Sequence, residues 1–329
     1  MKVAYDIPAP DDLRDVQVFP ARATTRSLLI RATTVGLIVS IAHLLYHLLT
    51  PTAHPGDFVW ALQTAYTLSQ GIDPYGFAPD PLLIPYPLPV ALFGVPFLWT
   101  IGVLPFFVAG AVFLGISAGL LTWSMLRAGE NWRLTLILLS GPFWMAVLVS
   151  QWSPLIVATW YIPVLAPLLV LVKPQIALPV AIAHKLSKPG LLIAGVVLLF
   201  SLIIDATWPF RFLSMMGPYQ STIPILTLPL GPLLILAALR WRDERGRLLL
   251  FMAVMPQRTI YDYLPLWLVP TGIRGLAVLT ALSWLVVLAG IPTWPAMFTT
   301  PDMQWAIHAL YLPALIILLL RKPQVRLSQ

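Results

Sequence analysis

Residues 51–89 read PTAHPGDFVWALQTAYTLSQGIDPYGFAPDPLLIPYPLP, and this polar, proline-punctuated stretch organises the chain around it. It follows the first long apolar run, which extends from about Ser27 to Thr50. Acidic side chains are scarce, with 13 in 329 residues. The stretch holds three of them: Asp57, Asp73 and Asp80. We call residues 51–105 the platform and expect them to lie at the surface of a membrane domain.

The composition outside the platform predicts the fold class. Hydrophobic residues make up 59% of the chain and charged residues only 10%. Several apolar runs reach the length of about 20 residues that an α-helix needs to cross a bilayer. A membrane β-barrel would instead show short alternating segments, and these runs do not alternate. We therefore predict an all-α, polytopic membrane protein with about 10 transmembrane helices, in a range of roughly 8–12.

The charge and the cysteine content exclude several classes of function. The formal net charge is +7, but in a membrane protein Lys and Arg mark cytoplasmic loops, so the charge does not indicate nucleic-acid binding. The chain has no cysteine, which excludes disulfides, thiolate chemistry and metal sites with Cys ligands.

The basic residues also predict the orientation. Arg22, Arg26 and Arg31 lie at the start of the first apolar run, which places the N-terminus in the cytoplasm and the platform outside. We expect a cytoplasmic tail over residues 1–26, one transmembrane domain over 27–320 and a second cytoplasmic tail over 321–329. The predicted location is the inner (plasma) membrane, with multiple passes and both termini in the cytoplasm.

Two segments allow alternative topologies. Residues 81–105 are apolar but interrupted by prolines. They form either a transmembrane span or a segment that is re-entrant or lies along the membrane surface. The second alternative keeps the basic residues that follow on the cytoplasmic side. Residues 154–184 form either one crossing with a short re-entrant helix or three short, proline-broken helices. Further spans are expected at about 106–126, 134–149, 191–207, 223–239, 276–290 and 305–320, and the many prolines predict that helices are kinked or broken.

Asp57 is the first candidate for chemistry. It precedes a predicted helix over residues 58–69 that Gly71 ends, and it can serve as the N-cap of that helix. That helix is too short to span, so it should lie along the interface. A carboxylate at the rim of a low-dielectric cavity can also act as a general base. Both interpretations are open from position alone.

Three basic residues break the predicted cytoplasmic bias: Lys173, Arg211 and Arg258. An anionic ligand at the outer face, such as a lipid phosphate, would need cations there. The alternatives are side chains that reach toward the interface or ion pairs with Asp205 or Asp262. Arg258 with Tyr261 and Asp262 forms the densest polar cluster in the second half of the chain.

Histidines offer a weak metal motif. His43 and His47 are spaced i, i+4 on the first apolar run, so they share a helix face and can ligate a metal. No third ligand is fixed by spacing, and we expect neither a metal site nor a cofactor.

Several motifs resemble a known enzyme family. They are Gly56-Asp57-Phe58, then Gly71-Ile72-Asp73-Pro74-Tyr75, then Pro85-Tyr86-Pro87-Leu88-Pro89 and, later, Gln151 and Lys173-Pro174. Their order resembles the first external loop and the following motifs of GT-C membrane glycosyltransferases, in particular glycosyltransferase family 87, the polyprenol-phosphate-mannose-using group.

The resemblance implies a fold and a reaction. It implies a GT-C-like fold and an inverting glycosyltransferase that moves a sugar, mannose or another hexose or pentose, from a polyprenyl-phosphate donor to a lipid, glycan or protein acceptor on the extracytoplasmic face. Its partners would be the polyprenyl-phosphate-linked sugar and membrane lipid, not nucleic acid. Asp57 would be the general base, and Lys173, Arg258 and Arg211 would bind the donor phosphate. The substrate cavity would be lined by His54, Tyr75, Tyr86, Gln151, Tyr261 and Asp262.

Two other classes of function stay open on the sequence. Broken helices and charges within the membrane are typical of transporters, so a lipid or solute transporter or flippase is one alternative. A non-catalytic GT-C-like membrane subunit is the other.

Overall fold

The computed structural model describes residues 24–51, 53–76, 86–184, 186–215, 221–290 and 304–321. Both predicted cytoplasmic tails lie almost wholly outside these ranges, and so does Asp80 in the platform. Every regular element of the described residues is a helix, and an isolated antiparallel bridge joins Thr222 and Gln257. The predicted all-α class is confirmed.

Three described helices are long and apolar enough to cross a membrane. They are α1 (Thr25–Leu49), α4 (Phe106–Arg127) and α13 (Ile273–Gly290). A fourth span arises if α10 (Lys188–Ile204) and α11 (Trp208–Met215), which meet at 89°, are counted as one bent unit. This architecture is compatible with a membrane protein.

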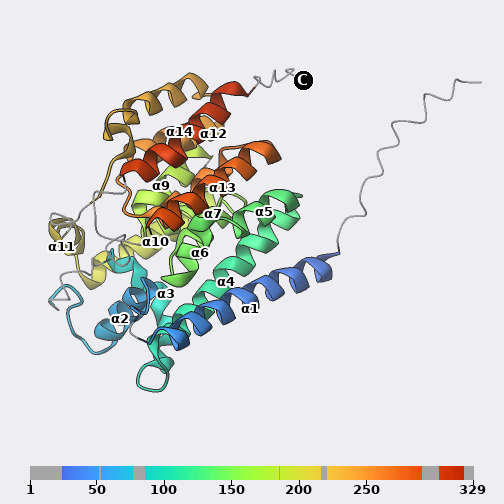
Figure 1. Ribbon diagram of the computed structural model, residues 1–329. Helices are drawn as coiled ribbons and strands as arrows, with labels where there is room; N and C mark the ends of the chain where they lie inside the picture. Colours follow the sequence, from blue (N-terminus) through green and yellow to red (C-terminus); the bar gives the residue numbers. More distant parts are fainter. Residues whose placement is uncertain are drawn as a thin grey trace, which may run out of the picture.

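Helices α1 and α4 lie side by side along most of their length, and small residues allow the close approach (Figure 1). A Cβ atom on Gly36 would lie 2.6 Å from the carbonyl oxygen of Gly115. Ser40 donates a hydrogen bond of 2.8 Å to the Ala111 carbonyl across the same seam. Small residues and interhelical hydrogen bonds are the usual means of packing helices in a bilayer.

The expected span over residues 134–149 is divided into two short helices. They are α5 (Asn131–Leu138) and α6 (Gly141–Leu148). Ser140 begins a new helix by accepting a hydrogen bond from the Phe143 amide, with proline in the first turn of α6. Gly141 is pressed against α13, where its amide donates to Ser283 Oγ over 3.0 Å.

Residues 154–184 form three short helices, which is the second of the two alternatives. They are α7 (Ser153–Ala158), α8 (Ala166–Val170) and α9 (Pro174–Ala183). Each carries proline in its first turn, where the missing amide hydrogen costs nothing.

The later segments are also broken, so the expected span at 223–239 is not a continuous α-helix. It contains the 3₁₀ turns η4 (Pro224–Leu226) and η5 (Gly231–Arg240). The remaining elements are α12 (Glu244–Val254), the 3₁₀ segment η6 (Ile260–Leu268) and α14 (Gln304–Leu320). Irregular backbone at membrane depth is tolerated where it is buried in protein or lines a cavity.

The platform contains the predicted helix with the expected bounds. Helix α2 spans Phe58–Ser69, and Gly71 follows with φ +67°. The described part of 81–105 forms η2 (Leu88–Val90), α3 (Ala91–Gly94) and η3 (Val95–Thr100) rather than one long helix. These short elements pack on α2 near the C-terminal end of α1 (Figure 1).

Residues predicted to be cytoplasmic contact one another. Arg133 and Arg245 both donate to the Pro270 carbonyl. Arg321 contacts Asp243 over 2.8 Å, and Arg240 donates to the Arg321 carbonyl over 2.6 Å. The 127–133 turn, the 240–247 loop and the end of α14 therefore form one basic region.

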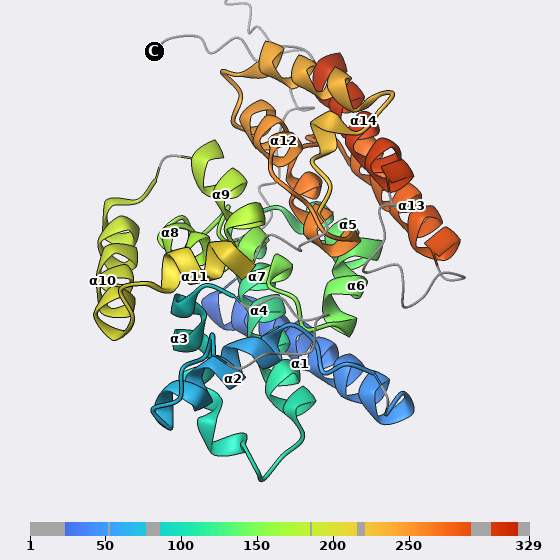
Figure 2. The same cartoon turned by 90° about the vertical axis from the view of Figure 1, so that its left-hand side faces the viewer.

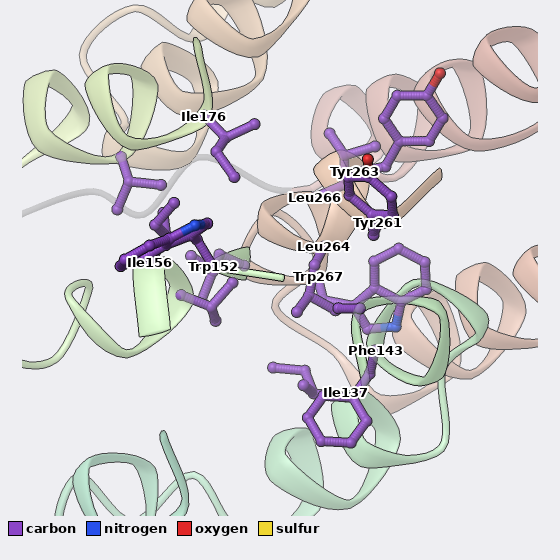
Figure 3. Close-up of a cluster of buried hydrophobic side chains, with 14 of the residues drawn as sticks. Ile137, Phe143, Trp152, Ile156, Ile176, Tyr261, Tyr263, Leu264, Leu266 and Trp267 are labelled. Atoms are coloured by element: carbon purple, nitrogen blue, oxygen red, sulfur yellow. The ribbon is translucent and has the colours of Figure 1, made fainter. Parts of the chain in front are cut away.

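The core lies where α6, α7, α9 and η6 meet. Figure 3 shows Trp152, Ile156 and Ile176 on one side of this contact, and Tyr261, Tyr263 and Trp267 on the other. All of these side chains are buried. The packing holds η6 against α7 and so fixes the polar residues that precede these elements.

Candidate functional site

Asp57 is held in place by its backbone. Its amide donates a hydrogen bond of 2.8 Å to the Val149 carbonyl at the end of α6. Gly56 precedes it with φ +92°, and a Cβ atom there would lie 2.5 Å from the Val149 carbonyl carbon. Only glycine satisfies both this conformation and this close approach.

His54 shapes the same turn instead of facing Asp57. Its Nδ1 accepts a hydrogen bond of 3.1 Å from the Gly56 amide, and the side chain is exposed. We place this residue, predicted to line the substrate cavity, in the loop that leads to the site.

The Asp57 carboxylate does not cap α2. It makes no side-chain capping hydrogen bond, so the N-cap interpretation is wrong for the side chain. Its Oδ2 accepts a hydrogen bond of 2.7 Å from the Tyr86 hydroxyl. The Tyr86 carbonyl accepts in turn from the Tyr75 hydroxyl over 3.1 Å. Three of the predicted platform residues therefore form one chain of hydrogen bonds.

Lys173 lies at the centre of the site. It directly precedes α9, and its side chain is 4% exposed. Nζ is 3.1 Å from Asp262 Oδ1 and 3.9 Å from Asp57 Oδ2. It also donates to Gln151 Oε1 and lies 4.9 Å from the centre of the Tyr261 ring. One ammonium group thus connects the platform, the 149–153 turn and η6.

Asp262 is the innermost charge of the site. Its side chain is fully buried, at 0% exposure. Its Oδ2 accepts a hydrogen bond of 3.2 Å from the Arg258 amide, and its own amide donates to the Thr259 carbonyl over 3.0 Å. The backbone of Arg258 therefore lies directly beside the Asp262 carboxylate.

Gln151 follows a strained turn. Ser150 has φ +47°, and it is the single non-glycine residue with positive φ among the described residues. The Val147 carbonyl can only accept, so His43 Nδ1 donates to it over 2.7 Å. His43 Nε2 therefore accepts from the Ser150 hydroxyl over 3.1 Å. Strain of this kind persists where the surroundings fix it, often at functional sites.

Sequence reasoning missed this role of His43. The i, i+4 histidine pair suggested a metal, yet no group of three or more His, Cys, Asp or Glu side chains suited to a metal occurs among the described residues. A buried histidine on α1 that reaches the turn before Gln151 leaves no signal in spacing, because His43 and Ser150 are 107 residues apart in the sequence.

The same turn carries unsatisfied polar groups. Gln151 Nε2, Trp152 Nε1 and Ser153 Oγ are buried, and none has a hydrogen-bond partner among the described residues. Buried polar groups are paired in most proteins, to protein or to bound molecules. All three can donate hydrogen bonds, so the turn next to Lys173 has unused capacity for a ligand rich in acceptors.

Arg211 lies in a second, more exposed cluster. It binds Asp73, contacts Asp205 over 3.1 Å and lies 5.2 Å from the centre of the Tyr75 ring. The hydrogen bond from Arg211 is the main reason that the pKa of Asp73 is below its usual value. Asp73 also stabilises a local turn, since its Oδ1 accepts from the Tyr75 amide over 2.9 Å.

The structure thus divides the predicted residues into two linked groups. The first group contains Asp57, Tyr86, Gln151, Lys173, Tyr261 and Asp262, with Arg258 beside them. The second cluster contains Arg211 and Tyr75. The hydrogen bond from Tyr75 to Tyr86 connects the two. No family model matches the chain, and no curated protein or solved structure is significantly similar to it.

Proposed function

We propose that the protein is an inverting glycosyltransferase of GT-C type that takes a sugar from a polyprenyl-phosphate donor. One observation carries the proposal. The carboxylate of the first-loop motif, Asp57, lies beside a buried ammonium group, Lys173, next to a turn with unpartnered hydrogen-bond donors. A base, a cation and donors in one place are what transfer of a phosphate-linked sugar requires.

The reaction is a single displacement. Asp57 accepts the proton of the acceptor hydroxyl, whose oxygen attacks the anomeric carbon. The bond between that carbon and the phosphate oxygen breaks on the opposite face, so the configuration inverts and polyprenyl phosphate leaves. The hydrogen bond from Tyr86 occupies Oδ2 of Asp57, which orients the carboxylate and leaves Oδ1 to take the proton.

The leaving phosphate needs more positive charge than Lys173 alone supplies. Asp262 and Asp57 already place two negative charges within 3.1 Å and 3.9 Å of that ammonium group. Arg258, whose backbone amide donates to Asp262 Oδ2 over 3.2 Å, is the second cation that we assign to the phosphate. Lys173 and Arg258 together stabilise the developing phosphate charge, with Gln151, Trp152 and Ser153 as hydrogen-bond donors. Arg211 is assigned no such role, because Asp73 and Asp205 balance its charge.

The proposed topology follows the same division of charge. Placing the basic region of Arg133, Arg240, Arg245 and Arg321 in the cytoplasm puts the platform and Asp57 on the outer side. Our proposal includes about 10 crossings, in which several short broken helices cross in combination. Both termini are then cytoplasmic, and the protein acts at the outer face of the plasma (inner) membrane on a lipid, glycan or protein acceptor.

The test is transfer of a radiolabelled sugar by purified protein in nanodiscs, with polyprenyl-phosphate mannose as the first donor. Asp57→Asn removes the base and keeps the shape, so the transfer rate should fall by about 10²–10⁴-fold. Asp243→Asn is the matched control, because this carboxylate lies in the basic region, away from the site, and the variant should keep the parental rate. A folded Asp57→Asn protein with full activity contradicts the assignment of the base. Substrate flux across vesicles without transfer by the parent contradicts the reaction class.

A further inference from the structure

Helix α11 leaves the end of α10 at an angle of 89° (Figure 2). The outward side chains of α10 are large and apolar, and the last turns expose four of them to more than half their area: Leu199, Phe200, Ile203 and Ile204. A helix that is apolar on its exposed face is suited to lipid and not to water. If α10 crosses the bilayer, a helix perpendicular to it lies in the plane of the membrane surface.

The inward face of α11 is fixed to the platform. Trp208 is buried against Tyr75 and Leu88, and its Nε1 donates to Ser201 Oγ over 3.1 Å. Arg211 lies one turn further and contacts Asp73 of the platform. Trp208 and Arg211 are three residues apart and therefore share a face of the helix.

The outward face of α11 is apolar and bare. Phe210 is 75% exposed and Leu213 is 64% exposed. They are also three residues apart, on the side of the helix away from Trp208. In the sequence, these two exposed residues follow closely on the exposed apolar residues of the last turns of α10. A short helix with a polar inner contact and an apolar outer face is typical of the membrane interface.

We propose that α11 is a membrane-surface helix whose Phe210 and Leu213 side chains insert into the acyl-chain region of the lipid bilayer. Insertion of these side chains holds the platform at the bilayer surface, because Arg211 of α11 packs on the Tyr75 ring and the Tyr75 hydroxyl donates to the Tyr86 carbonyl. The height of Asp57 relative to the lipid is thereby set by α11. The proposal does not depend on the transferase activity.

Site-directed spin labelling tests this directly, because the chain has no cysteine of its own. Phe210→Cys and Leu213→Cys are labelled singly in nanodiscs, and collision with oxygen and with a water-soluble nickel complex gives the depth of each label. Both positions are already exposed, so the variants keep the packing of α11. We expect both labels to favour oxygen, at about 5–10 Å below the lipid phosphates.

Two matched positions calibrate the result. Thr207→Cys lies in the exposed elbow before α11 and should favour the nickel complex. Phe200→Cys on α10 should favour oxygen more strongly than either α11 label. Labels at 210 and 213 that behave like the one at 207 would place α11 in water and overturn the proposal. Labels shielded from both reagents would show that protein covers this face, which overturns it equally.

Discussion

Replacing Lys173 by Met should leave the buried Asp262 carboxylate without its ion-pair partner. Asp262 has no exposed side-chain surface, and Lys173 Nζ is its ion-pair partner at 3.1 Å. Removing one partner of a buried ion pair typically costs about 3–5 kcal/mol. We therefore expect Lys173→Met to lower the free energy of unfolding by about 3–5 kcal/mol.

This loss should depend on which carboxylate remains. Adding Asp262→Asn to Lys173→Met should restore stability to within about 1 kcal/mol of the parent. Adding Asp57→Asn should restore less, because Asp57 is 19% exposed and lies 3.9 Å from Nζ.

The assay is titration with SDS in mixed micelles, with loss of the helical circular dichroism signal as the measure of unfolding. A loss below about 1 kcal/mol in Lys173→Met would mean that the ion pair is not desolvated as described. A double variant with Asp262→Asn that is no more stable than Lys173→Met would locate the damage elsewhere.

Three further variants follow from the contacts around the site. Tyr86→Phe loses the hydrogen bond to the site carboxylate and should lower the free energy of unfolding by about 1–2 kcal/mol in the same titration. Gly56→Ala should lower the free energy of unfolding by about 2–5 kcal/mol, because the φ of Gly56 is +92° and backbone atoms occupy the Cβ position. The control Gly71→Ala, with φ +67° and open space around it, should lower it by about 1–2 kcal/mol. The lowered pKa of Asp73 means that its contact with Arg211 stabilises the protein above about pH 4 and is lost as the pH falls. Arg211→Met should therefore flatten the decline of stability below pH 4, and a decline as steep as that of the parent contradicts this origin.

Local signals in the sequence were sufficient for part of the fold. Helix α2 begins after Gly56-Asp57 and ends before Gly71, and both limits follow from backbone conformations that favour glycine. The uninterrupted apolar runs of α1 and α4 were equally predictable, since nothing in them opposes a helix. The break between α5 and α6 had a signal in Ser140-Gly141-Pro142, but hydrophobicity summed over the segment conceals it.

The sequence singles out residues of this cluster one by one, but it does not show that they lie together. The motifs pointed to Asp57, Gln151 and Lys173 separately, but only tertiary packing brings η6 and α9 to the platform. The sequence suggests several acidic partners for Arg211 but does not show which of them it contacts. Asp73 and Asp205 bind it near the elbow between α10 and α11, so it does not join the other two outer cations.

The charge balance of the site favours a functional protein over a scaffold. Two carboxylates and one ammonium group lie together, with side-chain exposures of 19%, 0% and 4% for Asp57, Asp262 and Lys173. Well-packed apolar residues usually match or exceed the stability that such buried ionic groups provide. The neighbouring turn adds a strained Ser150 and three unpartnered donors, each a further cost in free energy. In the proposed transferase, a site that must take a proton and hold an anion requires these same groups.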